Sequence, residues 1–157
     1  MEALGALYAR LVAMLSSRWG EGIALLAVRL ALAGIFWRSG RTKVVEGSWL
    51  QVSDTTHFLF ETEYSGVPVL SPSLAATLAT WSETLFPMLL VAGLATRFSA
   101  LALFGMTMVI QIFVYPEAWW PVHSLWVALA LVLISRGGGP LALDTVVART
   151  AKTVSPA

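Results

Sequence analysis

The chain has 157 residues, of which 57% are hydrophobic and only 12% charged, and its formal net charge is +1. Soluble domains carry about 25% charged residues, so this composition excludes an ordinary soluble protein and indicates an integral membrane protein. The mean hydropathy of +0.76 supports this interpretation. The absence of cysteine excludes thiol–disulfide exchange, thiolate metal ligands and iron–sulfur clusters carried by this chain.

The N-terminal segment, residues 1–20, predicts an amphipathic helix. Leu4, Leu7, Leu11 and Leu15 recur at helical spacing and share one face. The segment lacks a small-residue cleavage site, so we expect no cleavable signal peptide. It is typical of a helix lying on the inner leaflet, and the alternative is that it packs against the rest of the protein.

Four long apolar segments follow, at 22–40, 73–95, 97–116 and 121–136. Each approaches the roughly 20 residues that a helix needs to cross a bilayer, and the fourth is short enough to begin in the interface. Their apolar residues form continuous runs without the alternation of barrel strands. The sequence therefore predicts an all-α membrane protein, a four-transmembrane-helix bundle in a single domain.

A long loop, residues 39–72, separates the first two predicted spans. Its apolar groups, Trp49 and the run 58–60, predict short helices that fold back over the mouth of the bundle. His57 lies in this loop, on the same side as His123 at the start of the fourth span. These two histidines are weak candidates for metal ligands, and without further clustered ligands no metal site is expected. Two histidines also make a multi-haem centre implausible.

Basic residues predict the orientation. Six of them fall on the side of the termini and three on the side of the long loop, where the acidic residues also gather. The positive-inside rule then places both termini and the tail, 137–157, in the cytoplasm of a bacterial or archaeal cell.

Polar residues inside the spans are the candidate functional residues. Arg29 lies in the first span, Glu83 near the middle of the second, Gln111 in the third and His123 at the start of the fourth. A charge inside the bilayer normally faces the bundle interior and has a partner, so we predict an ion pair between Arg29 and Glu83. Pro87 leaves the carbonyl of Glu83 without its helical donor, which predicts a local irregularity in the helix.

Two interpretations of Glu83 remain open at this point. In one, the paired carboxylate only fixes helix register. In the other, it accepts a proton or binds a headgroup at the edge of a quinone or small-molecule pocket, which Gln111 and His123 would serve from the outer side. Lys43 would lie with those two residues near the outer mouth.

Three stretches together resemble the DoxX family of small four-helix membrane proteins: "RLALAGIFWRSGRTKVVEG" (29–47), Glu83 followed by "GLATRFSALAL" (93–103), and "GGGPLALD" (137–144). The resemblance runs from Arg29 to Asp144. The family's features fall on the following positions of this chain: Arg29, Ser39, Gly40, Lys43, Glu83, Gly93, Arg97 and Asp144. The stretch 137–144 departs from the family's Gly-x-Gly-x-Leu-Ser-Leu-Asp pattern, which affects only the local turn.

The resemblance implies a membrane subunit associated with redox enzymes that handle sulfur or oxidative stress, in some cases with thiosulfate:quinone oxidoreductase. We therefore expect a non-catalytic subunit that presents quinone, or an anchoring surface, to a partner oxidoreductase, with homo-oligomers possible and no role for nucleic acid. The alternative functions are a small-molecule transporter or assembly chaperone without redox chemistry, and a pure scaffold.

Overall fold

The structure is a computed structural model that describes the backbone of residues 2–154 and the side chains of residues 3–150. The end of the predicted tail, 155–157, and the side chain of Lys152 lie outside the described residues. Between residues 2 and 154 the chain is helical, without a named strand. Its helices are α1 (Glu2–Leu15), α2 (Arg18–Arg41), α3 (Asp54–Thr62), α4 (Pro72–Ala92), α5 (Thr96–Phe113), the 3-10 helix η1 (Pro116–Ala118), the π-helix η2 (Trp119–His123), α6 (Ser124–Arg136) and α7 (Leu143–Val154).

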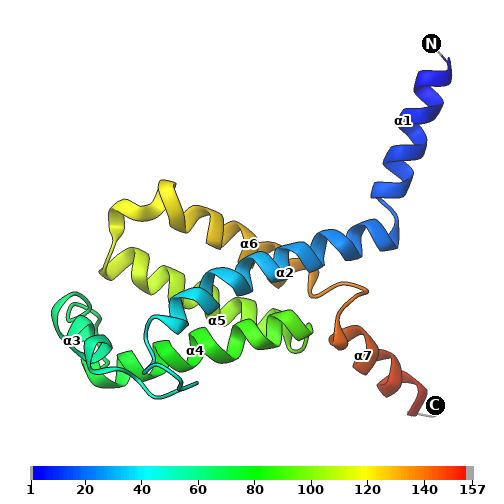
Figure 1. Cartoon of the computed structure of the whole chain (residues 1–157). Helices are drawn as coiled ribbons and strands as arrows, with labels where there is room; N and C mark the ends of the chain where they lie inside the picture. Colours follow the sequence, from blue (N-terminus) through cyan, green and yellow to red (C-terminus); the bar gives the residue numbers. More distant parts are fainter. Residues whose placement is uncertain (1, 155–157) are drawn as a thin grey trace.

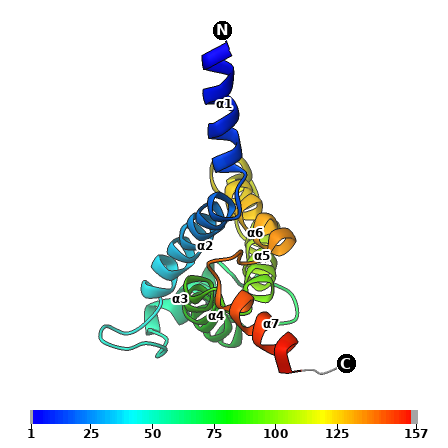
Figure 2. The same ribbon diagram turned by 90° about the vertical axis from the view of Figure 1, so that its right-hand side faces the viewer.

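Four helical stretches are long and apolar enough to cross a membrane, and they confirm the predicted fold class: Arg18–Arg41, Pro72–Ala92, Thr96–Phe113 and Pro116–Arg136. In Figure 1 the helices α2, α4, α5 and α6 run alongside one another, and Figure 2 looks along this bundle. One end carries α1, α7 and the turn between α4 and α5, and we call it the terminal end. The opposite end carries α3 and the segment 42–71, and we call it the loop end.

The helix boundaries follow from local capping. Ser17 and Ser71 accept hydrogen bonds through their side chains from the N–H groups of Gly20 and Leu74, which starts α2 and α4. Pro72 follows Ser71 at the first helical position, where its missing N–H is harmless. Gly93 ends α4 in the left-handed conformation. The predicted spans differ from the observed helices by a few residues because these caps decide the ends.

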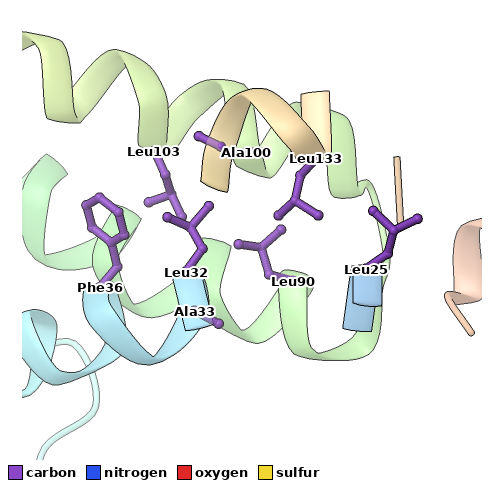
Figure 3. Close-up of a cluster of buried hydrophobic side chains, with 9 residues drawn as sticks. Leu25, Leu32, Ala33, Phe36, Leu90, Ala100, Leu103 and Leu133 are labelled. Carbon is purple, nitrogen blue, oxygen red and sulfur yellow. The ribbon is translucent and has the colours of Figure 1, made fainter. Parts of the chain in front are cut away.

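The core between the four helices is apolar (Figure 3). Leu32, Leu90, Leu103 and Leu133, one from each of α2, α4, α5 and α6, are fully buried at the centre. The helix faces that point outward are apolar too, as at Leu101, which is 54% exposed. Apolar side chains on both faces are what a helix bundle in lipid requires, because the surrounding acyl chains are as apolar as the core.

The terminal end is closed by Asp144 at the start of α7. Its carboxylate accepts hydrogen bonds from the N–H groups of Ala95, at 2.7 Å, and Thr96, at 2.8 Å, and so caps α5. The N–H of Asp144 donates to the Gly93 carbonyl at 2.9 Å. The turn between α4 and α5 is thereby tied to the segment that follows α6.

The two terminal helices lie outside the bundle. α1 extends away from the other helices in both views, with Leu4, Leu7 and Leu15 more than half exposed (Figures 1 and 2). The alternative that α1 packs against the bundle is therefore wrong, and its exposed apolar side chains suit a membrane interface. α7 forms a helix within the segment predicted only as a tail.

Gly93, in the turn between α4 and α5, provides a test of how closely the terminal end is packed. Its φ is +69°, and a Cβ there would lie 2.7 Å from Ala142 besides colliding with the Arg29 guanidinium. We expect Gly93→Ala to destabilise the protein by about 3 kcal/mol, through backbone strain and overpacking together. Thermal unfolding in detergent, followed by tryptophan fluorescence, measures the change.

Gly105→Ala is the matched control, because Gly105 is exposed on α5 and a Cβ there would meet no atom within 4 Å. Equal melting temperatures for the two variants would contradict the packing described for Gly93.

Candidate functional site

Glu83 lies inside the bundle at the middle of α4, and its partner is Lys43. The Lys43 Nζ donates to the Glu83 Oε2 at 2.8 Å and to the Ser39 Oγ at 2.9 Å. The two charged side chains are 11% and 3% exposed. The pair is therefore largely withdrawn from water. In such a buried environment the attraction within an ion pair is strong, and the loss of either partner destabilises the protein strongly.

The chain after α2 holds Lys43 in place. Its N–H donates to the Gly40 carbonyl at 3.1 Å, and its carbonyl accepts from the Ser53 N–H and the Thr56 hydroxyl, both at 3.0 Å. A short bridge between Val44 and Val52 closes this excursion. The lysine backbone is thus fixed by α3 and its approach, and the side chain reaches back over Gly40 to α4.

Gly40 permits that reach. A Cβ at Gly40 would lie 2.9 Å from the Glu83 carbonyl oxygen, so α2 and α4 approach each other closely here. Next to it, the Arg41 guanidinium donates to the Thr84 hydroxyl at 2.8 Å and lies 4.7 Å from the centre of the Trp37 ring. Small residues allow such an approach, and a cation–π contact adds to it.

The predicted ion pair between Arg29 and Glu83 is wrong. The Arg29 Nη1 donates to the Leu90 carbonyl at 3.1 Å and the Nη2 to the Leu141 carbonyl at 3.0 Å. In the antiparallel register of α2 and α4, Gly40 lies opposite Glu83, and it is eleven residues from Arg29. That separation is about 16 Å along a helix, beyond the reach of one arginine side chain.

Arg29 instead joins three elements of the terminal end. It binds carbonyls in the last turn of α4, where the helix dipole favours a cation, and a carbonyl of the segment leading to α7. The side chain is fully buried. Its role in the structure is to hold α2, α4 and the 137–142 segment together.

An apolar cavity of about 160 Å³ adjoins the Lys43–Glu83 pair. It lies between α4 and α5 and is covered by α3 and the loop that follows it. Its walls are almost entirely aliphatic and aromatic, and its polar groups are Lys43, Ser82, Glu83 and Tyr64. Leu78 and Val109, which also line it, are 44% and 39% exposed, so the cavity opens on the flank of the bundle where acyl chains would lie.

Tyr64 lines the cavity and is held there by contacts with two other aromatic rings. It is parallel to Phe60 at 4.4 Å between ring centres and perpendicular to Tyr115 at 6.1 Å. The Tyr115 hydroxyl donates to the Glu63 carboxylate. Burial, and then the neighbouring Tyr115, raise the pKa of the Tyr64 hydroxyl above its usual range, so it remains a proton donor at neutral pH.

The remaining candidate residues lie elsewhere. The His123 Nδ1 and the Gln111 Oε1 are 2.8 Å apart, and the Gln111 amide donates to the Pro116 carbonyl at 2.7 Å. This pair holds the π-helix turn between α5 and α6, and neither residue is among those that line the cavity. His57 lies on α3, and the described residues contain no group of three or more His, Cys, Asp or Glu that could hold a metal ion.

Sequence reasoning missed Tyr64 and the contact of Arg41 with Thr84. A tyrosine in a loop of ordinary polarity carries no signal of burial. A threonine in an apolar helix is usually bonded to its own backbone, as Thr84 also is, to the Thr80 carbonyl at 2.9 Å. Both positions depend on how the loop end folds back onto α4.

These features define a helical membrane protein of four spans with a buried ion pair beside an apolar cavity. The DoxX family model matches residues 24–116, and the chain belongs to the DoxX family. It is also 31% identical over 152 residues to an uncharacterized protein of Haemophilus influenzae, covering 87% of this chain and 91% of that one. No solved structure matches the chain.

Arg29→Lys tests the assignment of Arg29 to the terminal end. A lysine ammonium cannot reach the α4 carbonyls and the Leu141 carbonyl together, so we expect a loss of about 2–3 kcal/mol in stability. Arg38→Lys, at an exposed position of the same helix, should change stability by less than about 0.5 kcal/mol. Chemical or thermal unfolding in detergent compares them, and equal stability of the two variants would refute the assignment.

Proposed function

We propose that the protein is a redox-associated membrane subunit that binds the ring of a quinone in the cavity beside Glu83 and presents it to a partner oxidoreductase. The observation that carries the proposal is a ring-sized apolar cavity that ends at a buried ion pair. Family membership supports the proposal, since some DoxX-like proteins are associated with thiosulfate:quinone oxidoreductase and with other membrane redox complexes. A quinone, when bound, supplies the capacity to take up and release two electrons together with two protons.

The cavity fits such a group in size and chemistry. Its volume is about 160 Å³. An apolar cavity of about 150 Å³ holds a benzene ring in another protein, so the space suits one six-membered ring. Tyr64 and Phe60 offer aromatic faces, and Val109 and Leu78 lie where the isoprenoid tail would leave toward lipid.

The polar end supplies the groups that a quinone ring requires. The Lys43 ammonium and the Tyr64 hydroxyl are donors for ring carbonyl oxygens. The Glu83 carboxylate can accept a proton from a ring hydroxyl, and Lys43 stabilises that carboxylate in its charged form. The apolar walls exclude water, which confines proton exchange to these residues.

Electron transfer requires a partner in this proposal. The chain has no cysteine for an iron–sulfur centre or a disulfide, so the electrons would enter or leave through another protein. That requirement supports a subunit role in preference to a self-contained enzyme.

We further propose that the terminal end faces the cytoplasm of a bacterial or archaeal inner membrane. Of the three basic residues at the loop end, Lys43 is neutralised by Glu83, and Arg41 is bound to the Trp49 carbonyl and Thr84. The basic residues at the terminal end, such as Arg10 and Arg149, are exposed. Arg136 at the terminal end is likewise paired with Glu21, so the excess of basic residues at the terminal end is five against two once the paired residues are left out.

Quinone content after gentle detergent extraction tests the redox proposal. We expect quinone in the wild-type protein and at least a tenfold lower content in Glu83→Gln, whose amide can still accept a hydrogen bond from Lys43 but cannot take up a proton. Extraction into organic solvent followed by chromatography with absorbance detection measures both.

Glu117→Gln is the matched control, because Glu117 is an exposed carboxylate at the loop end that does not line the cavity. It should retain wild-type quinone. Absence of quinone from all three proteins would reject the redox proposal and favour the transporter or assembly-chaperone alternative.

A further inference from the structure

An open cleft of about 730 Å³ lies at the terminal end, outside the site described above. It is formed by the start of α5, the end of α6, the glycine run 137–139 and one face of α7. We propose that this cleft binds the phosphate headgroup of an anionic glycerophospholipid. The proposal is independent of the quinone site, which lies toward the loop end.

The cleft carries an excess of positive charge. Arg97, Arg136 and Arg149 line it from α5, α6 and α7, against one carboxylate, Asp144. Both oxygens of Asp144 already accept hydrogen bonds from the α5 N-terminus. The Asp144 charge is therefore already stabilised by contacts within the protein.

The three arginines differ in the hydrogen bonds and ion pairs that they make within the protein. Arg97 donates to the Ile134 carbonyl at 2.5 Å, and Arg136 donates to the Glu21 carboxylate. Arg149 is exposed and has no hydrogen-bond or ion-pair partner within the described part of the chain. A phosphate group offers Arg149 a charged acceptor, which none of the described side chains provides.

A buried hydroxyl also points to a ligand. Thr96 is among the residues that line the cleft, its side chain is 0% exposed, and its Oγ1 has no hydrogen-bond partner. The hydroxyl lies against the glycine run, where a Cβ at Gly138 would come within 2.6 Å of it. An unpaired buried hydroxyl is unfavourable, and a phosphate oxygen at the floor of the cleft would satisfy it.

The surroundings of the cleft favour a lipid over a free phosphate ester. Phe98, which lines the cleft, is 64% exposed on α5. On α7, Leu143, Val146 and Val147 are 48%, 56% and 59% exposed. Phe98 provides an apolar surface beside the arginines, whereas the apolar side chains of α7 lie on the face of that helix opposite the one that lines the cleft. α7 is thus an amphipathic helix whose polar face borders the cleft, an arrangement that suits a membrane surface.

Binding of phosphatidylglycerol to the purified full-length chain tests the proposal. In a zwitterionic detergent we expect phosphatidylglycerol to raise the melting temperature, and phosphatidylcholine at the same concentration to leave it unchanged. Arg149→Gln should weaken the phosphatidylglycerol affinity about fivefold, the effect typical of one basic side chain at an anionic headgroup.

Arg10→Gln is the control of equal charge, because Arg10 is exposed on α1 and is not among the residues that line the cleft. It should retain the wild-type affinity. An equal loss in Arg10→Gln and Arg149→Gln would show a diffuse surface attraction and overturn the proposal. Stabilisation by soluble glycerol 3-phosphate as strong as that by the lipid would overturn the assignment to a lipid.

Thr96→Val separates a ligand contact from a structural role. Valine matches threonine in shape and removes an unpaired hydroxyl, so the lipid-free protein should melt at the wild-type temperature or above it. The phosphatidylglycerol affinity should nevertheless fall. A variant with unchanged lipid affinity would show that the hydroxyl does not reach the ligand.

Discussion

The Lys43–Glu83 ion pair fixes the relation of the long loop to the bundle. A carboxylate that is 3% exposed in the middle of an apolar helix needs a cation, and this one comes from the chain just after α2. To deliver it, the chain must turn at Thr42, and the Lys43 carbonyl must be held by Ser53, which caps α3, and by Thr56 of α3. The pair therefore positions α3 and the roof of the cavity as well as the charge.

The buried charged groups of the bundle lie at two levels, with apolar side chains between them. At the terminal end, Arg29 and Asp144 satisfy the exposed backbone groups of the turn between α4 and α5. At the middle of α4, on the side nearer the loop end, Lys43 and Glu83 satisfy each other. Because no hydrophobic driving force selects among helix faces in lipid, such directional contacts at both levels define which helix faces which.

The sequence was sufficient to predict the fold class, since continuous apolar runs of this length form membrane-spanning helices. It was also sufficient to single out Glu83, since a charged residue inside a span is unfavourable unless it is paired or functional. It was insufficient for the partner of Glu83, because helix register is set by packing at Gly40 and Gly93. Tyr64 was missed because a loop residue acquires its burial only when the loop folds over α4. The helix α7 was missed because the short amphipathic stretch after the glycine run was read only as a tail.

A double-mutant cycle on stability tests the central claim most directly. Lys43→Met alone leaves a buried carboxylate unpaired and should cost about 3 kcal/mol, and adding Glu83→Gln to it should restore most of that loss. Arg29→Met and Glu83→Gln should be additive, because those residues share no contact. If instead Arg29 couples to Glu83 and Lys43 does not, then the register of α2 and α4, and with it the site, is wrong.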